Sequence, residues 1–373
     1  MLTFLRGAFW QLLAFDDDIA KQESLAQWPR VVTIVPARNE AETIARTVQS
    51  LVKQDYAGEL GLVVVDDHSE DGTGTLAREA AERMGATERV LILQSAALES
   101  GWTGKLLAMQ QGVESGAARD ADYFWFTDAD IEHAPDTLRR VVQRAEKDKL
   151  DLVSLMALSQ VQSFPERLLI PPFLYFFLKL YPPNWTASRK RKTAGAAGGC
   201  VLLKREALER IGGLAAIRGE VIDDCTLAKA VKRTGGRIWM GLTRKSVSLR
   251  TYASFREIQD LIARTAFTQL GYSGLALAGT LLGMFVTYLL PVIFTFSARP
   301  VLWRLGLAAW ALMAITYLPT IRFYRMSSLW AAALPAAAAF YTYATWLSAV
   351  RYWLGRGGQW KGRAQAPVKS SAD

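Results

Sequence analysis

A short apolar run that ends in two acids places the tightest limit on the fold of this chain. Residues 62–65 read Leu-Val-Val-Val and are followed at once by Asp66, Asp67 and a turn through Gly72. Four apolar, mostly β-branched residues bounded by turn chemistry predict a buried strand of a parallel sheet. Ligands of open α/β sheets bind just beyond the carboxyl ends of such strands. The two acids are therefore expected at a binding edge.

Two more acidic pairs follow along the chain: Asp128 with Asp130, directly after an apolar run, and Asp223 with Asp224. Adjacent carboxylates repel one another, and partial burial also opposes their ionisation. Such pairs are costly unless they bind something. Together they predict one carboxylate-lined cleft, as expected for a metal-dependent enzyme that acts on a nucleotide sugar.

Strands and helices are expected to alternate through the first half of the chain. Strands are predicted at 31–35, 62–65, 90–93 and 123–127, with helices at about 73–84 and 106–115. Strands separated by helices of ten or more residues predict a doubly wound, mostly parallel α/β sheet.

The distribution of charge predicts a second, membrane-associated region. Between residues 275 and 350 the only charged residues are four arginines, and apolar runs occur at 275–296, 301–321 and 329–350. Each run approaches the roughly 20 residues that a spanning helix needs. Three crossings would put the basic tail on the side opposite the enzyme domain, against the positive-inside rule. One run is therefore expected to be re-entrant or interfacial.

Five segments are expected along the chain. They are an N-terminal apolar or interfacial segment (1–27), a catalytic domain (28–262), an interfacial connector (263–274), a transmembrane helical region (275–350) and a basic tail (351–373). Within the catalytic segment, the apolar stretch 167–180 could lie in the lipid headgroup layer, line an acceptor groove or form part of a buried core.

Bulk properties exclude several classes of protein. The net charge is +9, which fits anionic lipid headgroups better than nucleic acid once a membrane region is present. The two cysteines, Cys200 and Cys225, are too few for a disulfide scaffold or a zinc site and fit a reducing cytosol.

Transfer of a sugar from a nucleotide diphosphate requires charge neutralisation on the leaving group and a base for the acceptor. A divalent cation, Mg²⁺ or Mn²⁺, held by one or two carboxylates serves the first need. Alternation along an extended segment would point Asp128 and Asp130 the same way, toward such a cation. Asp223 and Asp224 are the candidates for the general base.

Structural roles for these acids remain open. Asp66 and Asp67 could cap a helix, as could Asp223 and Asp224. Asp128 and Asp130 could form a simple Asx-turn.

Five motifs together carry a resemblance to a known family. They are V-x-I-V-P-A-R-N-E at 32–40, V-D-D-H-S-E-D-G-T at 65–73, G-W-T-G-K at 101–105, D-A-D at 128–130 and D-D-C-T-L at 223–227. This set resembles the family 2 glycosyltransferases of GT-A fold. The Gly-Gly-Cys at 198–200 and the apolar C-terminal region are most similar to the hopene-associated glycosyltransferases of bacterial hopanoid clusters.

The resemblance implies roles for individual residues. The loop Pro36, Ala37, Arg38 and Glu40 would lie over the nucleotide, and Asp67 or Asp66 would contact the base or ribose. Lys105 would approach the donor phosphates. Asp128 would contact the ribose or the metal, and Asp130 would be a metal ligand. Asp224 would be the base, with Asp223 beside it.

One motif of the family is absent. Processive relatives carry Gln-x-x-Arg-Trp after the base, and the corresponding region, 264–272, lacks it. Arg264 or Gln269 could partly replace it at the diphosphate. The loss favours a single transfer over polymerisation.

The resemblance therefore implies an inverting, metal-dependent glycosyltransferase of the bacterial inner membrane, with its catalytic domain in the cytoplasm. Its partners would be a nucleotide-diphosphate sugar and a lipid hydroxyl, such as that of a hopanoid. Alternatives are a polyprenyl phosphate or glycerolipid acceptor, or a noncatalytic nucleotide-sugar-binding membrane protein.

Overall fold

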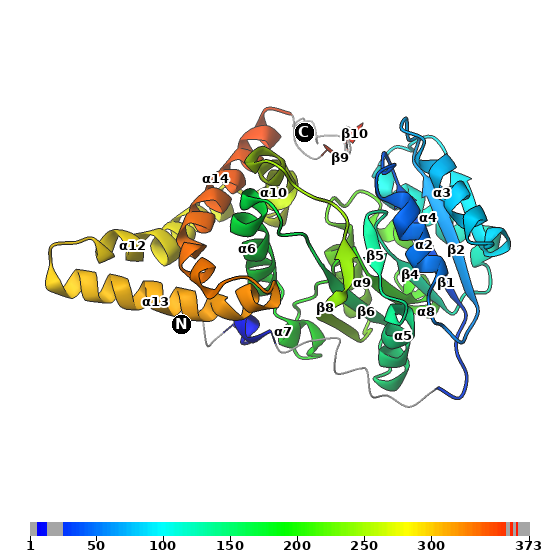
Figure 1. Cartoon of the computed structure of the whole chain (residues 1–373), viewed down its shortest axis with the longest axis horizontal. Coiled ribbons are helices and arrows are strands. Elements are labelled where there is room, and N and C mark those ends of the chain that lie inside the picture. The colour runs from blue at the N-terminus through cyan, green and yellow to red at the C-terminus, as the bar shows by residue number, and fades with distance from the viewer. Residues whose placement is uncertain (1–5, 13–24, 356–358, 361–362, 365–373) are drawn as a thin grey trace. The chain divides into compact units, whose positions relative to one another are not determined.

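The computed structural model describes residues 6–12, 25–355, 359–360 and 363–364 (Figure 1). Most of the expected N-terminal segment and of the basic tail lies outside these residues. The described residues form two compact units. Among the described residues, the α/β unit comprises 25–159, 183–250, 360 and 363–364, and the helical unit comprises 6–12, 160–182, 251–355 and 359.

This division differs from the one expected from composition. Residues 160–182 and 251–262, expected inside the catalytic segment, belong to the helical unit. The apolar stretch 167–180 therefore packs with the C-terminal helices rather than with the sheet.

The described residues of the α/β unit form an eight-stranded sheet of order β3-β2-β1-β4-β7-β6-β8-β5. Its strands are β1 (Val31–Ala37), β2 (Leu60–Asp66), β3 (Val90–Gln94), β4 (Tyr123–Phe126), β5 (Ile131–His133), β6 (Leu152–Leu158), β7 (Val201–Lys204) and β8 (Ile238–Ser248). The neighbours from β3 to β4, and the pair β6 and β8, are parallel. The pairings of β7 with β4 and β6, and of β5 with β8, are antiparallel. The mostly parallel α/β sheet is thus confirmed.

Helices cover both faces of this sheet. They are α2 (Ile44–Val52), α3 (Thr73–Arg83), α4 (Gly104–Glu114), α5 (Thr137–Lys147), α7 (Pro183–Ala187), α8 (Arg205–Arg210) and α9 (Asp223–Arg233). Short 3₁₀ turns η3 (Thr87–Arg89), η4 (Gly116–Ala118) and η5 (Leu214–Ile217) join some of them. Residues of α2, α3 and α5 share one buried cluster, whereas those of α4, α8 and α9 share the other.

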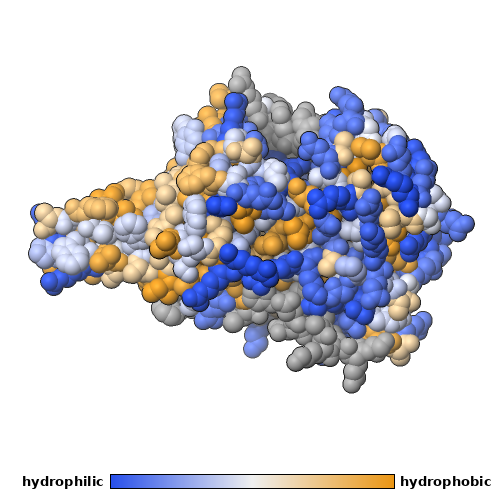
Figure 2. All heavy atoms as spheres, viewed as in Figure 1, coloured by the Kyte–Doolittle hydropathy of each residue, from blue (hydrophilic) through white to orange (hydrophobic). Residues whose placement is uncertain are grey.

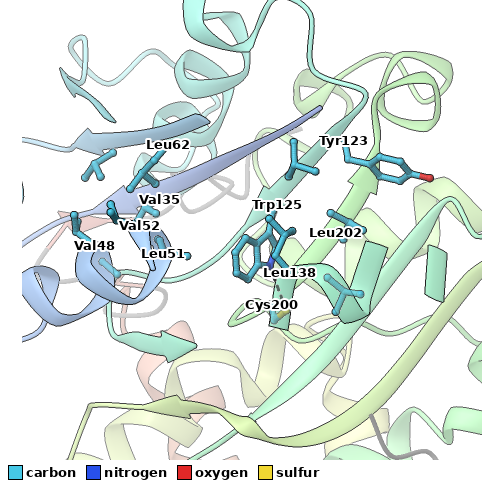
Figure 3. Packing of buried hydrophobic residues seen from close by; sticks show 14 of the residues in the cluster. Val35, Val48, Leu51, Val52, Leu62, Tyr123, Trp125, Leu138, Cys200 and Leu202 are labelled. Atoms are coloured by element: carbon cyan, nitrogen blue, oxygen red, sulfur yellow. Dashed lines mark hydrogen bonds between the residues drawn. The ribbon is translucent and has the colours of Figure 1, made fainter. Parts of the chain in front are cut away.

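Alternation along the central strands explains why both faces are apolar. In β1, Val31 and Val35 belong to the first cluster, and Val32 and Ile34 belong to the second. Figure 3 shows the first cluster around Trp125, whose indole N–H donates to the Cys200 sulfur at 3.3 Å. A strand buried on both faces reads as a continuous apolar run, which is the pattern found in the sequence.

The helical unit contains the apolar C-terminal region. Its elements are η1 (Phe9–Gln11), α6 (Phe164–Leu180), α10 (Phe255–Gln269), α11 (Gly274–Met284), the π-helical turn η6 (Phe285–Leu289), α12 (Leu290–Thr295), α13 (Pro300–Phe323), η7 (Ser328–Ala333) and α14 (Leu334–Trp353). Two-residue strands β9 (Gln359–Trp360) and β10 (Arg363–Ala364) pair with each other.

Within the described part of the chain, two helices are long and apolar enough to cross a membrane, at 274–295 and 300–323. Apolar side chains gather over α12 and α13 in Figure 2. The third apolar run forms η7 and α14 instead. Helix α14 is fixed to α10 because the Ser348 hydroxyl donates to the Ala263 carbonyl at 2.5 Å and accepts from the Phe267 amide at 3.0 Å.

Helix α6 is well specified despite its prolines. Ser163 and Glu166 form a capping box at its start, which satisfies the free amides of the first turn. Its middle buries Leu169, Leu174 and Leu178 inside the helical unit. Of the three locations considered for the apolar stretch 167–180, this burial favours the buried core.

The region in place of the missing motif lies at the end of α10. There Gln269 accepts a hydrogen bond from the Tyr181 hydroxyl at 2.7 Å, within the helical unit.

Candidate active site

The predicted donor loops meet at one edge of the sheet. Strand β1 is parallel to both β2 and β4, with Ala37 opposite Asp66 and Ile34 opposite Phe126. The carboxyl ends of parallel neighbours lie at the same edge. The segments that follow these three strands therefore lie together there.

Lys105 is the centre of a charged cluster at this edge. Its ammonium lies 2.8 Å from Asp128 Oδ1 and 3.0 Å from Asp223 Oδ2. The Lys105 side chain is only 17% exposed. A lysine and two acids from three separate segments thus converge.

Local structure holds each member of this cluster in place. Lys105 is in the first turn of α4, whose N-cap residue Thr103 accepts from the Leu106 amide at 3.4 Å. Asp223 and Asp224 occupy the first turn of α9, where the positive end of the helix dipole favours carboxylates.

Asp224 lies beside the ion pairs and is held by main-chain donors. Its Oδ2 accepts from the Gly198 amide at 2.8 Å, and its Oδ1 accepts from the Cys225 amide at 2.7 Å. The bond from Gly198 belongs to a distant segment, so capping of α9 does not account for the position of this carboxylate.

The electrostatics of the cluster are strongly coupled. Burial opposes the charge on Lys105, but the carboxylates of Asp128 and Asp223 outweigh it and raise the lysine pKa. Burial, reinforced by the negative charge of Asp223, raises the pKa of Asp224 to about 6. Lys105 and the two amide donors pull that pKa in the opposite direction. Asp224 is therefore ionised at neutral pH and is a better base than an ordinary aspartate.

A small hollow adjoins the cluster. Polar groups line one part of it, and Pro36, Met109, Phe126 and Ile217 supply apolar lining. A few convergent polar groups in a partly apolar hollow are typical of a small-molecule site.

Gly198 leaves room in this hollow that no other residue type would leave. An added Cβ would lie 3.3 Å from Lys105 Nζ and 3.4 Å from Asp128 Oδ2. It would also lie 3.6 Å from Asp224 Oδ2.

Asp130 belongs to a second charged group at the same edge. Arg250 Nε lies 3.4 Å from Asp130 Oδ2, and Arg250 Nη2 lies 3.2 Å from Glu40 Oε1. Arg250 follows the end of β8 and was not among the residues predicted from the sequence. No local motif marks it, because the pairing of β5 with β8 brings it to Asp130.

The expected alternation of Asp128 and Asp130 is not seen. The two carboxylates contact different cations, Lys105 and Arg250. Strand β4 ends at Phe126, and the Ile131 amide donates to the Asp128 carbonyl at 3.4 Å. Residues 128–130 therefore form a turn, to which the two-residue period of a strand does not apply.

A buried hydrogen-bond relay supports this turn. The Thr127 hydroxyl lies 2.9 Å from His133 Nε2 and donates to the Gly199 carbonyl at 2.9 Å. His133 Nδ1 lies 2.8 Å from the Ser246 hydroxyl. Burial lowers the pKa of His133 to about 3, so the ring is neutral and serves as a structural link.

The acids after β2 form a third group with the loop after β1. Asp67 is 1% exposed, and its Oδ2 lies 3.8 Å from Arg38 Nη1. Asp66 Oδ1 accepts from the Ser69 amide at 3.0 Å. Because α3 is capped at Gly72, neither acid acts as its N-cap. The Asn39 amide, which donates to the Ser69 hydroxyl at 3.0 Å, further joins the two loops.

The acidic residues fit a cation that the substrate helps to coordinate. Among the residues that the structure describes, no cluster of three or more His, Cys, Asp or Glu side chains could hold a metal ion. Mg²⁺ typically uses one or two carboxylates and completes its shell with substrate phosphates and water. Asp128 and Asp130 supply this number of carboxylates, and both are partly exposed.

Part of this region matches a known protein family. Residues 32–212, a little under half of the chain, match the model of glycosyl transferase family 2. The matched residues contain the strands β1 to β7 and thus the donor loops, Lys105, Asp128 and Gly198. Asp223, Asp224 and Arg250 lie beyond the matched residues.

Relatives that match part of this chain have glycosyltransferase names. The chain is 30% identical over 110 residues to the probable glycosyltransferase YdaM of Bacillus subtilis, covering 27% of this chain and 26% of that one. It is 32% identical over 114 residues to the undecaprenyl-phosphate mannosyltransferase of Micrococcus luteus, covering 31% and 43%. The matches span less than half of either relative.

A solved structure resembles more of the chain than the family model matches. The mannosyltransferase PcManGT from Pyrobaculum calidifontis, in complex with GDP-Man and Mn²⁺, has a TM-score of 0.53 and 20% identity, with 92% of each chain covered. At this identity the likeness concerns the fold, which is GT-A-like.

Proposed function

We propose that this protein is an inverting, metal-dependent glycosyltransferase that moves one sugar from a nucleotide-diphosphate donor to the hydroxyl of a lipid, a hopanoid. The match to the family 2 model supports the reaction class. The observation that carries the proposal is the cluster of Lys105 with Asp128 and Asp223, beside Asp224, at a hollow on the sheet edge.

Lys105 would stabilise the leaving group. The diphosphate gains negative charge as its bond to the sugar breaks, and a fixed cation at that point lowers the barrier. Its present partners, Asp128 and Asp223, hold the ammonium at the hollow. A bound Mg²⁺ or Mn²⁺ would neutralise further charge on the same diphosphate, with Asp128 and Asp130 as its protein ligands.

Asp224 would remove the proton of the acceptor. As the acceptor oxygen forms its bond to the anomeric carbon, its proton passes to the Asp224 carboxylate. The bond from that carbon to the diphosphate oxygen breaks, and its electron pair leaves with the diphosphate. Attack from the face opposite the leaving group inverts the anomeric centre. Amide donors to both carboxylate oxygens support this role because they fix the orientation of the base.

The acceptor is proposed to be a lipid because of the two apolar helices at 274–295 and 300–323. The enzyme would be located in the bacterial inner membrane, with its α/β unit in the cytoplasm, where nucleotide sugars occur. The similarity to a hopene-associated family favours a hopanoid hydroxyl. The Micrococcus luteus relative is named for undecaprenyl phosphate, which makes a polyprenyl phosphate the second candidate acceptor.

Product analysis tests this function. Purified protein is incubated with bacterial lipids, Mn²⁺ and a mixture of nucleotide-diphosphate sugars, and the lipids are analysed by mass spectrometry. One glycosyl increment on a hopanoid is expected. An increment on polyprenyl phosphate would support the second acceptor. Nucleotide-sugar binding without any glycosylated lipid would contradict the enzymatic proposal.

The pH dependence of transfer should report the charge of Asp223. We expect kcat/KM of the wild type to rise with pH through about 6, as Asp224 loses its proton. Asp223→Asn removes a negative neighbour, so the pKa of Asp224 falls and the rising limb moves about one pH unit lower. The exposed Asp120→Asn is the matched control and should leave the limb in place. A limb that stays unchanged or moves upward in Asp223→Asn would show that Asp224 is not the titrating base.

A further inference from the structure

Arg250 joins two acids that come from different loops of the α/β unit. Its guanidinium contacts Asp130, in the turn after β4, and Glu40, in the loop after β1. Arginine stays charged at any physiological pH, and its planar fork can bridge two carboxylates. The contacts therefore place a permanent positive charge against a proposed metal ligand.

Backbone pairing makes this placement specific. Strands β5 and β8 are antiparallel, with Ile131 opposite Ser248. The Leu249 amide then donates to the Asp130 carbonyl at 2.7 Å. This backbone hydrogen bond holds the main chain of Arg250, the next residue, close to Asp130.

The other partner is also anchored by hydrogen bonds. The Glu40 amide donates to the Thr73 hydroxyl at 2.8 Å. The Ala129 carbonyl, next to Asp130, accepts from the hydroxyls of Thr43 and Thr47 at 3.1 and 2.9 Å. The backbone that carries both acids is thus fixed, whereas the Arg250 side chain is 32% exposed and can turn toward solvent.

We propose that Arg250 occupies the cation position of the donor-free enzyme and yields it when metal and donor diphosphate bind together. A divalent cation on Asp130 would be repelled by a guanidinium only 3.4 Å from the same carboxylate. The diphosphate offers the guanidinium a bidentate partner in exchange. The inference rests on the proposed function, and it explains how metal binding is made dependent on the donor.

Two properties follow for the protein. Donor-free enzyme binds Mn²⁺ weakly, because Arg250 already neutralises Asp130 and Glu40. Bound diphosphate removes this competition and gains an ion pair, so nucleotide and metal strengthen one another.

Manganese binding tests the inference without any measurement of turnover. Free Mn²⁺ is followed by electron paramagnetic resonance as wild-type protein, Arg250→Ala and Arg250→Lys are titrated, first alone and then with GDP or UDP. Arg250→Ala should bind Mn²⁺ about tenfold more tightly than wild type when no nucleotide is present. With nucleotide present, Arg250→Ala should no longer bind Mn²⁺ more tightly than wild type, because the diphosphate has lost the guanidinium as its partner. Arg250→Lys should bind donor-free Mn²⁺ nearly as weakly as wild type.

Arg244→Ala is the matched control, because it removes an equal charge from an exposed position on β8, the strand that precedes Arg250. It should leave Mn²⁺ binding unchanged, and circular dichroism should show all variants folded. Donor-free affinity in Arg250→Ala that equals or falls below that of wild type overturns the inference. If wild type still transfers sugar with Mn²⁺ in that case, the proposed function holds and only the inference about Arg250 fails. If nucleotide brings no Mn²⁺ to wild type, the metal assignment itself fails.

Discussion

Asp224→Asn is expected to lower kcat by about a thousandfold while leaving the affinity for the donor within about twofold. The amide is close in shape and retains a carbonyl oxygen that can accept from the Gly198 amide. It cannot take a proton from the acceptor hydroxyl. Steady-state transfer at saturating donor and Mn²⁺, together with calorimetry of donor binding, separates these two effects.

Asp148→Asn, at the end of α5 and outside the charged clusters, serves as the control and should transfer at the wild-type rate. Retention of wild-type kcat by folded Asp224→Asn would remove this residue from the role of base. A loss confined to donor affinity would instead assign Asp224 to donor binding.

Asp130→Ala should abolish the metal-dependent part of donor binding, a loss of about a hundredfold in affinity. The substitution removes one of two proposed protein ligands and one of the two acids that Arg250 contacts. Calorimetry with the donor is done with Mn²⁺ and again with EDTA. Wild-type protein in EDTA should fall to the level of the variant, whereas the variant should not respond to metal.

The exposed Asp120→Ala controls for loss of a carboxylate in the same domain. If Asp130→Ala still binds donor more tightly with Mn²⁺ than with EDTA, by the same factor as wild type, Asp130 is not a ligand.

The sheet was predictable because the central strands are buried on both faces. Val63 and Val65 face one cluster and Val64 faces the other. The sequence therefore shows an unbroken apolar run that ends where the sheet ends. Acids placed directly after such runs are expected at the sheet edge, and Asp128, which follows β4, lies there beside Lys105.

The direction of individual side chains was less predictable. The alternation assumed for Asp128 and Asp130 requires an extended backbone, but β4 ends two residues before Asp128. Strand boundaries depend on the hydrogen bonds of neighbouring strands, which local sequence does not specify.

Arg250 could not be found from a motif for a similar reason. Glu40 and Arg250 are 210 residues apart, and the pairing of β5 with β8 determines their meeting. An arginine after an apolar strand is common on protein surfaces, so only the tertiary structure distinguishes this one.

The division into units also depends on long-range packing. Composition predicted that residues 160–182 belong to the catalytic segment, yet α6 is part of the helical unit. An apolar helix buries its surface against neighbouring elements, and the sequence of α6 alone does not predict which elements these are.

Anomalous diffraction from crystals grown with Mn²⁺ and a nucleotide-diphosphate sugar would test most directly whether one cation and one incoming alcohol share this edge of the sheet. We expect a manganese peak between the donor diphosphate and the carboxylates of Asp128 and Asp130, with Asp224 facing the anomeric carbon. Manganese or donor bound away from these residues, or an Asp224 directed away from the sugar, would contradict the account.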